Sequence, residues 1–455
     1  MTAVPRPMHL AVLCLGADDA AVPADPRSAG RIDFAFFERL ARTAERGLFD
    51  FLLLTGGELL TGGELLTGGE LLTGGEGLCP SEHGERGDGP DPVGRPEPIT
   101  LLSALAAVTE RLGLAATAAP AVNEPYELAR RLASLDHLSG GRAAWHVATA
   151  ADPRAGENFR RDGPFGRADR YAHAEEFVRA ARRLWDSWTP DGVPRRLAHS
   201  GRHFTIAGEF TVPRSPQGHP VVIHAGDSAD AREFAASAAD VLVTRHGPPA
   251  EGTSRTSRTS RTSGPDARAP GPDTRAAGGL RVLRKAAFVL GSGDAEAQER
   301  AAEIRRQRIS PQSAIRALER IWGRDLSAYD PDGPLPAIDP GPAAAPGAGG
   351  PSGTAARWRA LAEAKGLSIR QTVIETSGRQ PFIGTPRAVA DAMADSVARG
   401  TADGFVLTPS PAPGGLDDFV AQVVPLLQER GAFRPRYTGA TLRSHLGLPE
   451  PVWNG

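Results

Sequence analysis

Eight short apolar runs, most of them separated by helical patterns, constrain the fold of this chain more than any other feature of its sequence. The runs are Leu10–Leu15, Phe49–Leu54, Leu112–Thr117, Ala143–Thr149, Val221–Ala225, Val241–Thr244, Val282–Leu290 and Gly404–Thr408. Strands that alternate with helices indicate a parallel sheet that is covered on both faces. Eight repeats of this unit predict an α/β fold, the (β/α)8 TIM barrel with insertions, and a doubly wound open sheet is the alternative.

The stretch from Asn123 to Trp145 shows the repeating unit most clearly. Pro125 stands near the first helical position, where a missing N–H costs nothing. Leucines recur at helical spacing as far as Leu138, and Ser139–Gly141 then ends the helix before an apolar strand. Further helices are predicted over Phe34–Arg46, Ile99–Arg111, Arg170–Trp188, Ala229–Ala239, Pro386–Arg399 and Leu416–Glu429.

Three low-complexity segments do not fit the repeat, and we interpret them as insertions in a single barrel domain that spans residues 1–455. The hexapeptide Thr-Gly-Gly-Glu-Leu-Leu recurs in tandem over Thr55–Leu78, inside a loop insertion at 55–96. Thr-Ser-Arg repeats at 253–261 belong to a linker at 247–279, which is predicted to be disordered where a barrel helix is expected. A Pro-, Gly- and Ala-rich part at 331–353, within an insertion at 291–383 before the last strand, is also predicted to be disordered.

The composition limits the classes of partner and the compartment. The chain has 455 residues, with 52 lysines and arginines against 54 aspartates and glutamates, and its arginines are scattered, which argues against a nucleic-acid partner. Its cysteines, Cys14 and Cys79, are too few for a disulfide framework and suit a reducing cytoplasm. We find no secretion signal and no apolar run near the ~18 residues of a membrane span. We therefore expect a cytoplasmic protein without a membrane partner.

Polar residues at the carboxyl ends of the predicted strands are the candidates for chemistry, because barrel active sites form there. Gly226-Asp227-Ser228 joins a strand directly to a helix, so backbone N–H groups and the Ser228 hydroxyl could bind a phosphate. Asp227 is predicted to cap that helix, and an ordinary capping loop is the alternative. His146 is either a site residue or a packed core histidine. No metal site is predicted, because the histidines and cysteines lack ligand spacing.

Short motifs in a constant order run along most of the chain. They are Asn123–Arg130, Ala133–Trp145, Asn158-Phe159, Asp169–Tyr171, Ala174–Phe177, Leu184–Trp188, Pro213–Gly218, Ala225–Ser228, Gly384–Pro386, Asp403–Phe405, Gln428–Gly431 and Thr441–Arg443. Together they resemble the flavin-dependent monooxygenases of the bacterial luciferase-like superfamily. The most similar branch is that of nitrilotriacetate monooxygenase component A and dibenzothiophene-sulfone monooxygenase.

This resemblance implies a barrel that binds FMN at the carboxyl ends of its strands and uses FMNH2 from a separate NAD(P)H:flavin reductase. The reduced flavin and O2 would oxidise a small organic substrate, while the protein positions the flavin and excludes water. A homo-oligomer, either a dimer or a tetramer, is also expected. Two alternatives stay open. One is a catalytically impaired or repurposed barrel that binds flavin or another small ligand weakly, and the other is a different flavin reaction, such as a deazaflavin-dependent one.

The resemblance also implies a set of cofactor-binding positions. These are Gly56, Thr117, His146, Thr149, Arg167, Tyr171, Gly226, Asp227 and Ser228. Gly226, Ser228 and Tyr171 correspond to contacts of the FMN phosphate. Arg167 replaces a histidine of the family pattern and can still pair with phosphate.

Several ring-side positions depart from that pattern. The family has an aspartate at Gly56, an asparagine at His146 and a serine at Ala150, and Ala119-Pro120 replaces a serine–threonine pair. His146 keeps a hydrogen-bond donor, but the other replacements remove side-chain hydrogen bonds, each worth on the order of 1 kcal/mol. The sequence therefore predicts FMN that is anchored at its phosphate and held weakly at its ring, and it does not identify which residues are catalytic.

Overall fold

The computed structural model describes residues 8–14, 33–55, 96–149, 167–189, 191–245, 279–341, 350–376, 382–409 and 415–453. The tandem hexapeptide beyond Thr55 and the Thr-Ser-Arg repeats at 253–261 lie outside these ranges. The same is true of most of the segments 55–96 and 247–279, so the predictions made for them stay predictions.

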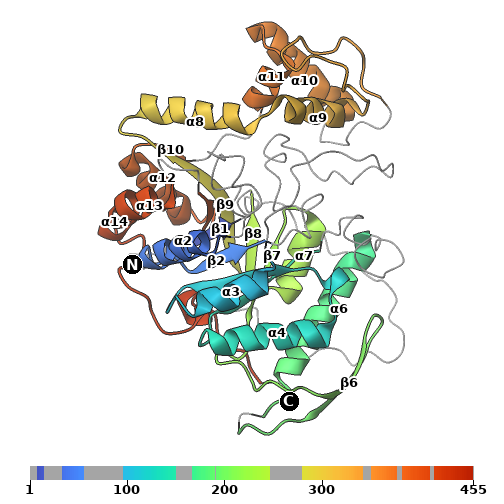
Figure 1. The fold of residues 1–455 in the computed structure, drawn as a ribbon, viewed down its shortest axis with the longest axis vertical. Helices are drawn as coiled ribbons and strands as arrows, with labels where there is room; N and C mark the ends of the chain where they lie inside the picture. The colour runs from blue at the N-terminus through green and yellow to red at the C-terminus, as the bar shows by residue number, and fades with distance from the viewer. Residues whose placement is uncertain are drawn as a thin grey trace.

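Eight parallel strands form a closed barrel (Figure 1). In order around the ring they are β1 (His9–Cys14), β2 (Phe51–Leu54), β3 (Gly113–Ala118), β4 (Ala143–Val147), β7 (Val221–Ala225), β8 (Val241–Thr244), β9 (Arg281–Leu290) and β11 (Gly404–Thr408). The ring closes because β11 pairs with β1 and β8 pairs with β9. All eight predicted strands are confirmed, and the open-sheet alternative is wrong. A short strand, β10 (Phe382–Gly384), extends the pairing of β9.

The helices that cover the barrel match the predicted ones with shifted ends. They are α2 (Phe34–Arg46), α3 (Pro98–Ala106), α4 (Pro125–Leu138), α6 (Arg167–Trp185), α7 (Ala229–Ala238), α12 (Pro386–Ala398), α13 (Leu416–Asp418) and α14 (Val424–Glu429), the last two joined by the π-helical turn Phe419–Val423. After α4 the chain turns through Gly140 and Gly141, whose φ angles of 66° and 89° favour glycine.

The predicted helix Ile99–Arg111 was wrong in its second half, because α3 ends at Ala106. The guanidinium of Arg142 lies buried beneath the following turn and donates to the carbonyl oxygens of Ala106, Thr109 and Leu112. These carbonyls are therefore satisfied without a further helical turn. The cation that ends the helix comes from a distant part of the sequence.

Inward-facing side chains lie in layers to which alternate strands contribute, because the strands are staggered. The strand register places three successive layers inside the barrel, from Ala11, Ala115, Ile223 and Leu283, through Leu53, His146, Val243 and Val406, to Leu13, Thr117, Ala225 and Lys285. One step nearer the carboxyl end, the same alternation brings in Thr55, Ala148, Arg245 and Thr408. We call these last two layers the mouth of the barrel. Apart from His146 in the second layer, the interior is thus apolar below the mouth, and the mouth itself contains most of the polar side chains.

The amino end of the barrel is closed by the segment around α15 (Leu442–His445). Leu442, Leu446 and Leu448 pack against the inward-facing strand residues and belong to the interior apolar cluster. Among the described residues, these leucine side chains fill the amino end, and the polar side chains of the interior lie toward the mouth.

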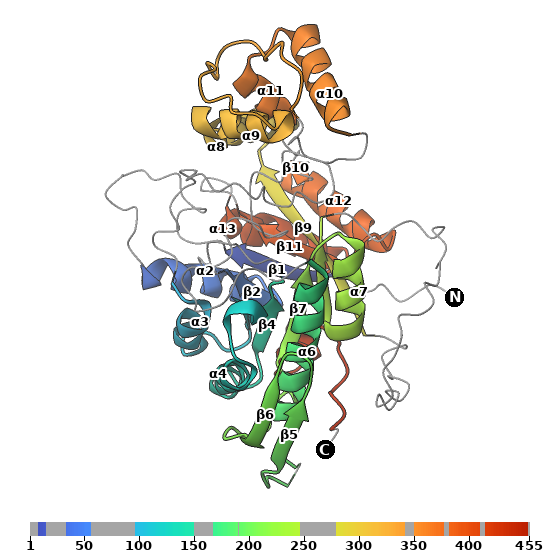
Figure 2. The same ribbon diagram turned by 90° about the vertical axis from the view of Figure 1, so that its right-hand side faces the viewer.

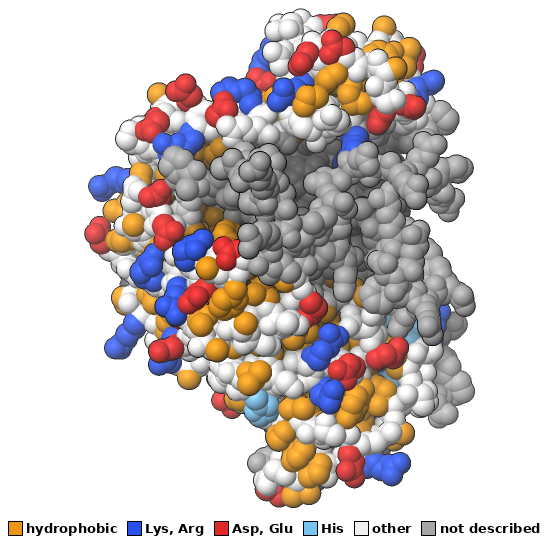
Figure 3. Space-filling view, in the orientation of Figure 1, with side chains coloured by type: hydrophobic (Ala, Val, Ile, Leu, Met, Phe, Trp, Pro, Cys, Tyr) orange, Lys and Arg blue, Asp and Glu red, His pale blue; other side chains and the backbone are white. Residues whose placement is uncertain are grey.

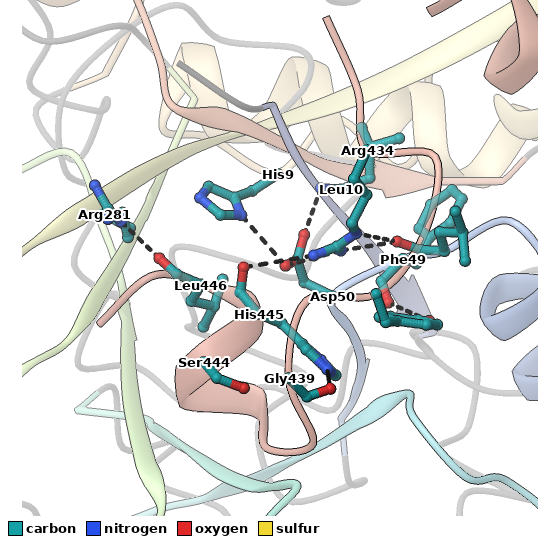
Figure 4. Close-up of polar contacts among 12 residues, drawn as sticks. His9, Leu10, Phe49, Asp50, Arg281, Arg434, Gly439, Ser444, His445 and Leu446 are labelled. Atoms are coloured by element: carbon teal, nitrogen blue, oxygen red, sulfur yellow. Dashed lines mark hydrogen bonds and ion pairs between the residues drawn. The ribbon is translucent and has the colours of Figure 1, made fainter. Parts of the chain in front are cut away.

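A buried ion cluster fixes this closing segment to the first two strands (Figure 4). The carboxylate of Asp50 accepts from the backbone N–H of Leu10 and lies 3.2 Å from Nδ1 of His9 and 2.9 Å from Nη2 of Arg434. Burial alone would raise the pKa of Asp50, but Arg434 and His9 hold this pKa below its ordinary value. The contacts join structural elements at the end of the barrel opposite the mouth, so this cluster serves stability.

The insertion before the last strand forms a helical module beside the barrel (Figure 1). It consists of α8 (Asp294–Arg308), α9 (Pro311–Trp322), α10 (Gly350–Lys365) and α11 (Ile369–Thr376). The last three share an apolar core of their own, in which the rings of Trp322 and Trp358 lie 6.4 Å apart.

The disorder predicted for 331–353 was wrong for residues 331–341 and for the first turn of α10. Trp322 Nε1 donates to the carbonyl oxygen of Ile338 at 2.9 Å, and the N–H of Gly341 donates to the carbonyl of Trp322 at 2.7 Å. The N–H of Arg370 donates to the carbonyl of Pro331 at 2.8 Å. Partners on neighbouring helices therefore order a segment whose composition indicates disorder, and the remaining residues 342–349 lie outside the described part.

A hairpin that was not predicted projects from the barrel between α6 and β7 (Figure 2). Its strands are β5 (Arg196–Ser200) and β6 (Thr205–Glu209), which pair in antiparallel fashion. The carboxylate of Glu176 on α6 accepts from the backbone N–H groups of His203 and Phe204 and thereby attaches the hairpin turn to that helix.

Acidic and basic side chains are interspersed over the face of the molecule seen in Figure 3, and neither sign forms a continuous field there. Within the described ranges, no helix combines the length and the apolar character that crossing a membrane requires.

Candidate active site

His146 and Thr117 form the polar centre of the barrel interior, on neighbouring strands β4 and β3. Nδ1 of His146 lies 3.0 Å from Oγ1 of Thr117, and both side chains are buried. Burial, with a smaller effect of nearby His224, lowers the pKa of His146 to about 3, so the imidazole is neutral near pH 7. When the Thr117 hydroxyl donates to Nδ1, the ring proton lies on Nε2 and is available to a ligand.

Two threonine hydroxyls in the mouth lack a hydrogen-bond partner among the described residues. They are Oγ1 of Thr55, which follows β2, and Oγ1 of Thr408 at the end of β11. Both oxygen atoms are buried, and a buried hydroxyl without a partner carries a desolvation penalty. These hydroxyls are therefore suited to a polar ligand that enters the mouth.

The segment Gly226-Asp227-Ser228 has the predicted position but a different division of roles. Ser228, and not Asp227, is the N-cap of α7: its Oγ accepts from the N–H of Ala231 at 3.2 Å. The Asp227 carboxylate instead accepts from the backbone N–H of Arg245 at 3.1 Å and from its Nε at 2.9 Å. The prediction that Asp227 caps the helix was wrong, because the guanidinium of Arg245 on the adjacent strand holds this carboxylate.

Because Ser228 caps the helix and Asp227 pairs with Arg245, the segment is suited to bind an anion. The Ser228 hydroxyl accepts a hydrogen bond through oxygen and still has a proton to donate. The N-terminus of the ten-residue helix α7 adds partial positive charge. Because Arg245 compensates the negative charge of Asp227, the objection that a like charge would repel a phosphate is weakened.

Tyr171 stands on α6 next to this segment, where its ring contacts an outward-facing histidine of β7. The centroids of the Tyr171 and His224 rings are 6.1 Å apart, and Tyr171 also lies 5.9 Å from Phe234 of α7. Nδ1 of His224 lies 3.0 Å from the carbonyl oxygen of Val147, and burial lowers the pKa of His224 to about 4. Sequence reasoning missed His224, because it lies inside an apolar run.

The remaining predicted positions are only partly placed. Thr149 follows β4 and is half-buried, and Ala119-Pro120 leads into the short 3-10 turn Pro120–Val122 after β3. Gly56 and Ala150 lie outside the described residues, and Arg167 is described only as the first residue of α6. Within the described residues, no group of three or more histidines, cysteines or carboxylates is arranged to hold a metal ion.

Sequence reasoning also missed Thr408 and Lys285 as site residues. Val406 and Lys285 are opposite each other in the β11–β9 pairing, and Val406 belongs to the interior cluster, so both point into the barrel. Side chains of a strand alternate between its two faces, and Leu283 lies two residues before Lys285 on the same strand. This alternation is the signal that could have identified Lys285 as an inward-facing residue.

Comparisons with known proteins give the family. The model of the luciferase-like monooxygenase family matches residues 8–403. The chain is 34% identical to N-acetyl-S-(2-succino)cysteine monooxygenase of Bacillus subtilis, over 94% of this chain and 93% of that protein. It is 35% identical to nitrilotriacetate monooxygenase component A of Aminobacter aminovorans, over 92% of this chain and 91% of that protein. The structure of EDTA monooxygenase from Chelativorans sp. BNC1 superposes with a TM-score of 0.66 at 27% identity, covering 99% of this chain and 100% of that one. The chain therefore belongs to the luciferase-like monooxygenase family.

Proposed function

We propose that this chain is the oxygenase of a two-component system, in which it oxidises a small organic substrate with O2 and with FMNH2 supplied by a separate NAD(P)H:flavin reductase. Its family members are flavin-dependent monooxygenases, and its named relatives act on small organic substrates. The observation that carries the proposal is the polar mouth above an apolar barrel interior. A flavin needs this combination, because its ring is apolar on both faces and polar at one edge.

The residues at the mouth fit FMN at its phosphate end. Ser228, the backbone at Gly226 and the N-terminus of α7 form an anion site, to which Tyr171 can add its hydroxyl. Arg167 stands at the start of α6 and is proposed as a further phosphate partner. Asp227 supports this site indirectly, through its ion pair with Arg245.

The residues at the ring end would hold the flavin with fewer contacts. His146 and Thr117 supply a neutral donor pair, and the Thr55 and Thr408 hydroxyls have donors to offer. Thr149 and the backbone at Gly56 are proposed to border the same site. When bound, reduced flavin supplies the activation of O2.

The chain's own contribution is to bind, orient and exclude water. The leucines that close the amino end, together with the apolar layers beneath His146, keep water from reaching the site from below. A neutral His146 can donate a hydrogen bond without bringing a charge that would draw water in. No observation on the described residues favours the alternative of a catalytically impaired or repurposed barrel.

Flavin fluorescence tests the proposal directly. Addition of the purified chain to FMN should quench the flavin emission, and riboflavin should be quenched far less because it lacks the phosphate. Equal affinities for FMN and riboflavin would contradict the phosphate anchor.

A second measurement tests the division of labour with a reductase. Substrate oxidation should occur with chemically reduced FMN and O2, and NADH alone should not support it. Turnover with NADH at the same rate would contradict the two-component proposal. We also propose a cytoplasmic homo-oligomer, a dimer or a tetramer, which light scattering of the purified protein can test.

A further inference from the structure

Two threonine hydroxyls at the mouth are buried without a hydrogen-bond partner in the described part of the chain, namely Oγ1 of Thr55 and Oγ1 of Thr408. By contrast, the buried Thr372 of α11 donates from its hydroxyl to the carbonyl oxygen of Ser368 at 2.8 Å. An unpartnered buried hydroxyl destabilises the folded state, because it has given up water without gaining another partner. Two such hydroxyls in one layer of the mouth indicate that a ligand supplies the missing partners.

The order of the strands places these two hydroxyls on different walls of the mouth. The residues proposed to hold FMN belong to three consecutive strands of the ring, which are β3 with Thr117, β4 with His146 and β7 with the segment that ends at Ser228. Strand β2 pairs with β3, so Thr55 stands beside this flavin side. Strand β11 is the fourth strand from β4 in both directions around the ring, so Thr408 stands opposite His146.

The wall around Thr408 is apolar. In the pairing of β11 with β9, Thr408 is opposite Ala287, and the pairing of β1 with β11, continued by one residue, places Leu13 on its other side. Leu13 belongs to the interior apolar cluster. The cations near this wall are engaged within the chain, because Arg245 is held in an ion pair and Lys285 has an interaction of its own. The Thr408 hydroxyl is therefore the group on this wall that needs a partner.

A carbonyl oxygen suits this hydroxyl better than a charged group or an N–H group. A charged group would exchange its hydration for one hydrogen bond in an apolar wall, which is unfavourable. An N–H group would leave the threonine proton without an acceptor, whereas a carbonyl oxygen accepts that proton. Because the interior of an eight-stranded barrel is narrow, a flavin along β3, β4 and β7 leaves the β11 side for the substrate.

We propose that the Thr408 hydroxyl donates a hydrogen bond to a carbonyl oxygen of the substrate, on the wall of the mouth that faces the flavin. The proposal rests on the proposed function, since it assigns one group of the substrate at that same site. It gives Thr408 to the substrate and leaves Thr55 beside the flavin. Thr408 is thus a specificity-determining residue, which selects substrates with an uncharged acceptor at this point.

Three valine variants test the proposal, because valine keeps the shape of threonine and removes its hydroxyl. They are Thr408→Val, Thr55→Val for the flavin side, and the control Thr372→Val, in which the lost hydroxyl already has a partner. The ligand probes are acetophenone and α-methylstyrene, in which a methylene group replaces the carbonyl oxygen. For each protein we would measure the thermal unfolding midpoint without ligand and the FMN affinity by fluorescence quenching. Calorimetric titration with FMN present gives the affinity for each probe.

The unfolding midpoint of Thr408→Val should rise by about 1–3 °C, because the unpartnered polar group is gone, and that of Thr372→Val should not rise. The wild type should bind acetophenone more tightly than α-methylstyrene. Thr408→Val should bind acetophenone roughly fivefold more weakly and keep its FMN affinity within about twofold. Thr55→Val should instead weaken the binding of FMN.

Several outcomes would overturn the proposal. One is an unchanged or lower unfolding midpoint in Thr408→Val, and another is a wild type that binds neither probe or binds both equally. A loss of FMN affinity in Thr408→Val as large as in Thr55→Val would assign both hydroxyls to the flavin and would overturn it as well.

FMN quenching by the same samples separates this proposal from the proposed function. If the wild type binds FMN and Thr408→Val binds acetophenone as tightly as the wild type does, the substrate assignment fails and the proposed function stands. If the wild type does not bind FMN, the proposed function fails first, and the assignment of Thr408 to a monooxygenase substrate fails with it.

Discussion

Thr117 and His146 share a hydrogen bond of 3.0 Å across strands β3 and β4, and the other interior residues of the His146 layer are apolar. The bond satisfies one ring nitrogen of a histidine that cannot reach bulk water. It also fixes the ring orientation, so that the other nitrogen has a defined role toward a ligand.

Acid should unfold the protein in part through its buried histidines. The pKa values of His146 and His224 are lowered to about 3 and about 4 by burial, whereas an unfolded histidine has a value of 6.5. Between these values the unfolded state binds more protons, so the stabilising contribution is present above pH 6.5 and is lost as pH falls. Each histidine should lower the free energy of unfolding by roughly 1.4 kcal/mol per pH unit in this window. Urea unfolding of wild type and His146→Gln between pH 7.5 and 5 measures this slope.

The slope should be smaller in His146→Gln than in the wild type. The exposed His137 on α4 provides the matched control, and His137→Gln should leave the slope unchanged. The same slope in all three proteins would contradict the role of burial at His146.

Asp136 should have the opposite effect on the pH dependence of the free energy of unfolding. Its Oδ1 accepts from the N–H of Ala143 at 2.8 Å and from Nε2 of Gln217 at 2.6 Å, but its buried Oδ2 has no described partner. Burial raises the pKa of Asp136 to about 6. Between about pH 4 and pH 6, Asp136 is therefore protonated in the folded state and ionised in the unfolded state. This residue therefore gives stability below pH 4 that is lost as pH rises through 6. Asp136→Asn, which cannot titrate, should remove this component from the pH dependence of unfolding. An unchanged difference between pH 4 and pH 6.5 would refute the assignment.

Ser228→Asp separates helix capping from phosphate binding. Aspartate is as good an N-cap as serine, so α7 should stay folded. Its negative charge would oppose the FMN phosphate, and the affinity for FMN should fall roughly tenfold to a hundredfold, with riboflavin little affected. The exposed Ser134 on α4 supplies the control Ser134→Asp, whose FMN affinity should equal that of wild type. Parallel losses for FMN and riboflavin would place the effect outside the phosphate site.

Arg434→Met should destabilise the amino end of the barrel. Removal of the guanidinium leaves the Asp50 carboxylate buried with His9 as its remaining ionisable partner, at a cost of about 3–5 kcal/mol. The double variant Asp50→Asn with Arg434→Met should recover part of this loss, because the buried charge is gone. Urea unfolding at pH 7.5 measures both, and additive losses in the double variant would contradict the coupling.

The barrel itself could be predicted because its information is local. Each strand is recognisable as an apolar run, and each helix as a repeating apolar face. The positions of eight strands and most helices could therefore be predicted from the sequence. The end of α3 could not be placed, because Arg142, which satisfies the carbonyls of the following turn, lies a full βα unit further along the chain. The hairpin β5–β6 was missed for a similar reason, since it depends on Glu176 of α6.

The candidate site was predictable in position but not in roles. The sequence indicated that Gly226-Asp227-Ser228 lies at a helix N-terminus, yet it could not show that Arg245 would hold Asp227 and leave the cap to Ser228. Lys285 and Thr408 were missed because their meaning depends on the stagger of the strands, which sets the layer each inward residue joins. The register of the strands is a property of the assembled sheet, so no single apolar run of the sequence specifies it.

The position of the closing segment has a consequence for biosynthesis. Strand β1 pairs with β11, and the leucines that close the amino end come later still, at 442–448. During translation the open edge of β1 must therefore persist until β11 has left the ribosome, and the interior stays unfilled until residues 442–448 have followed. Contacts that span so much of the sequence slow folding and leave strand edges exposed to other chains. Production of this protein should accordingly depend on chaperones and on slow translation at low temperature more than its stability once folded would suggest.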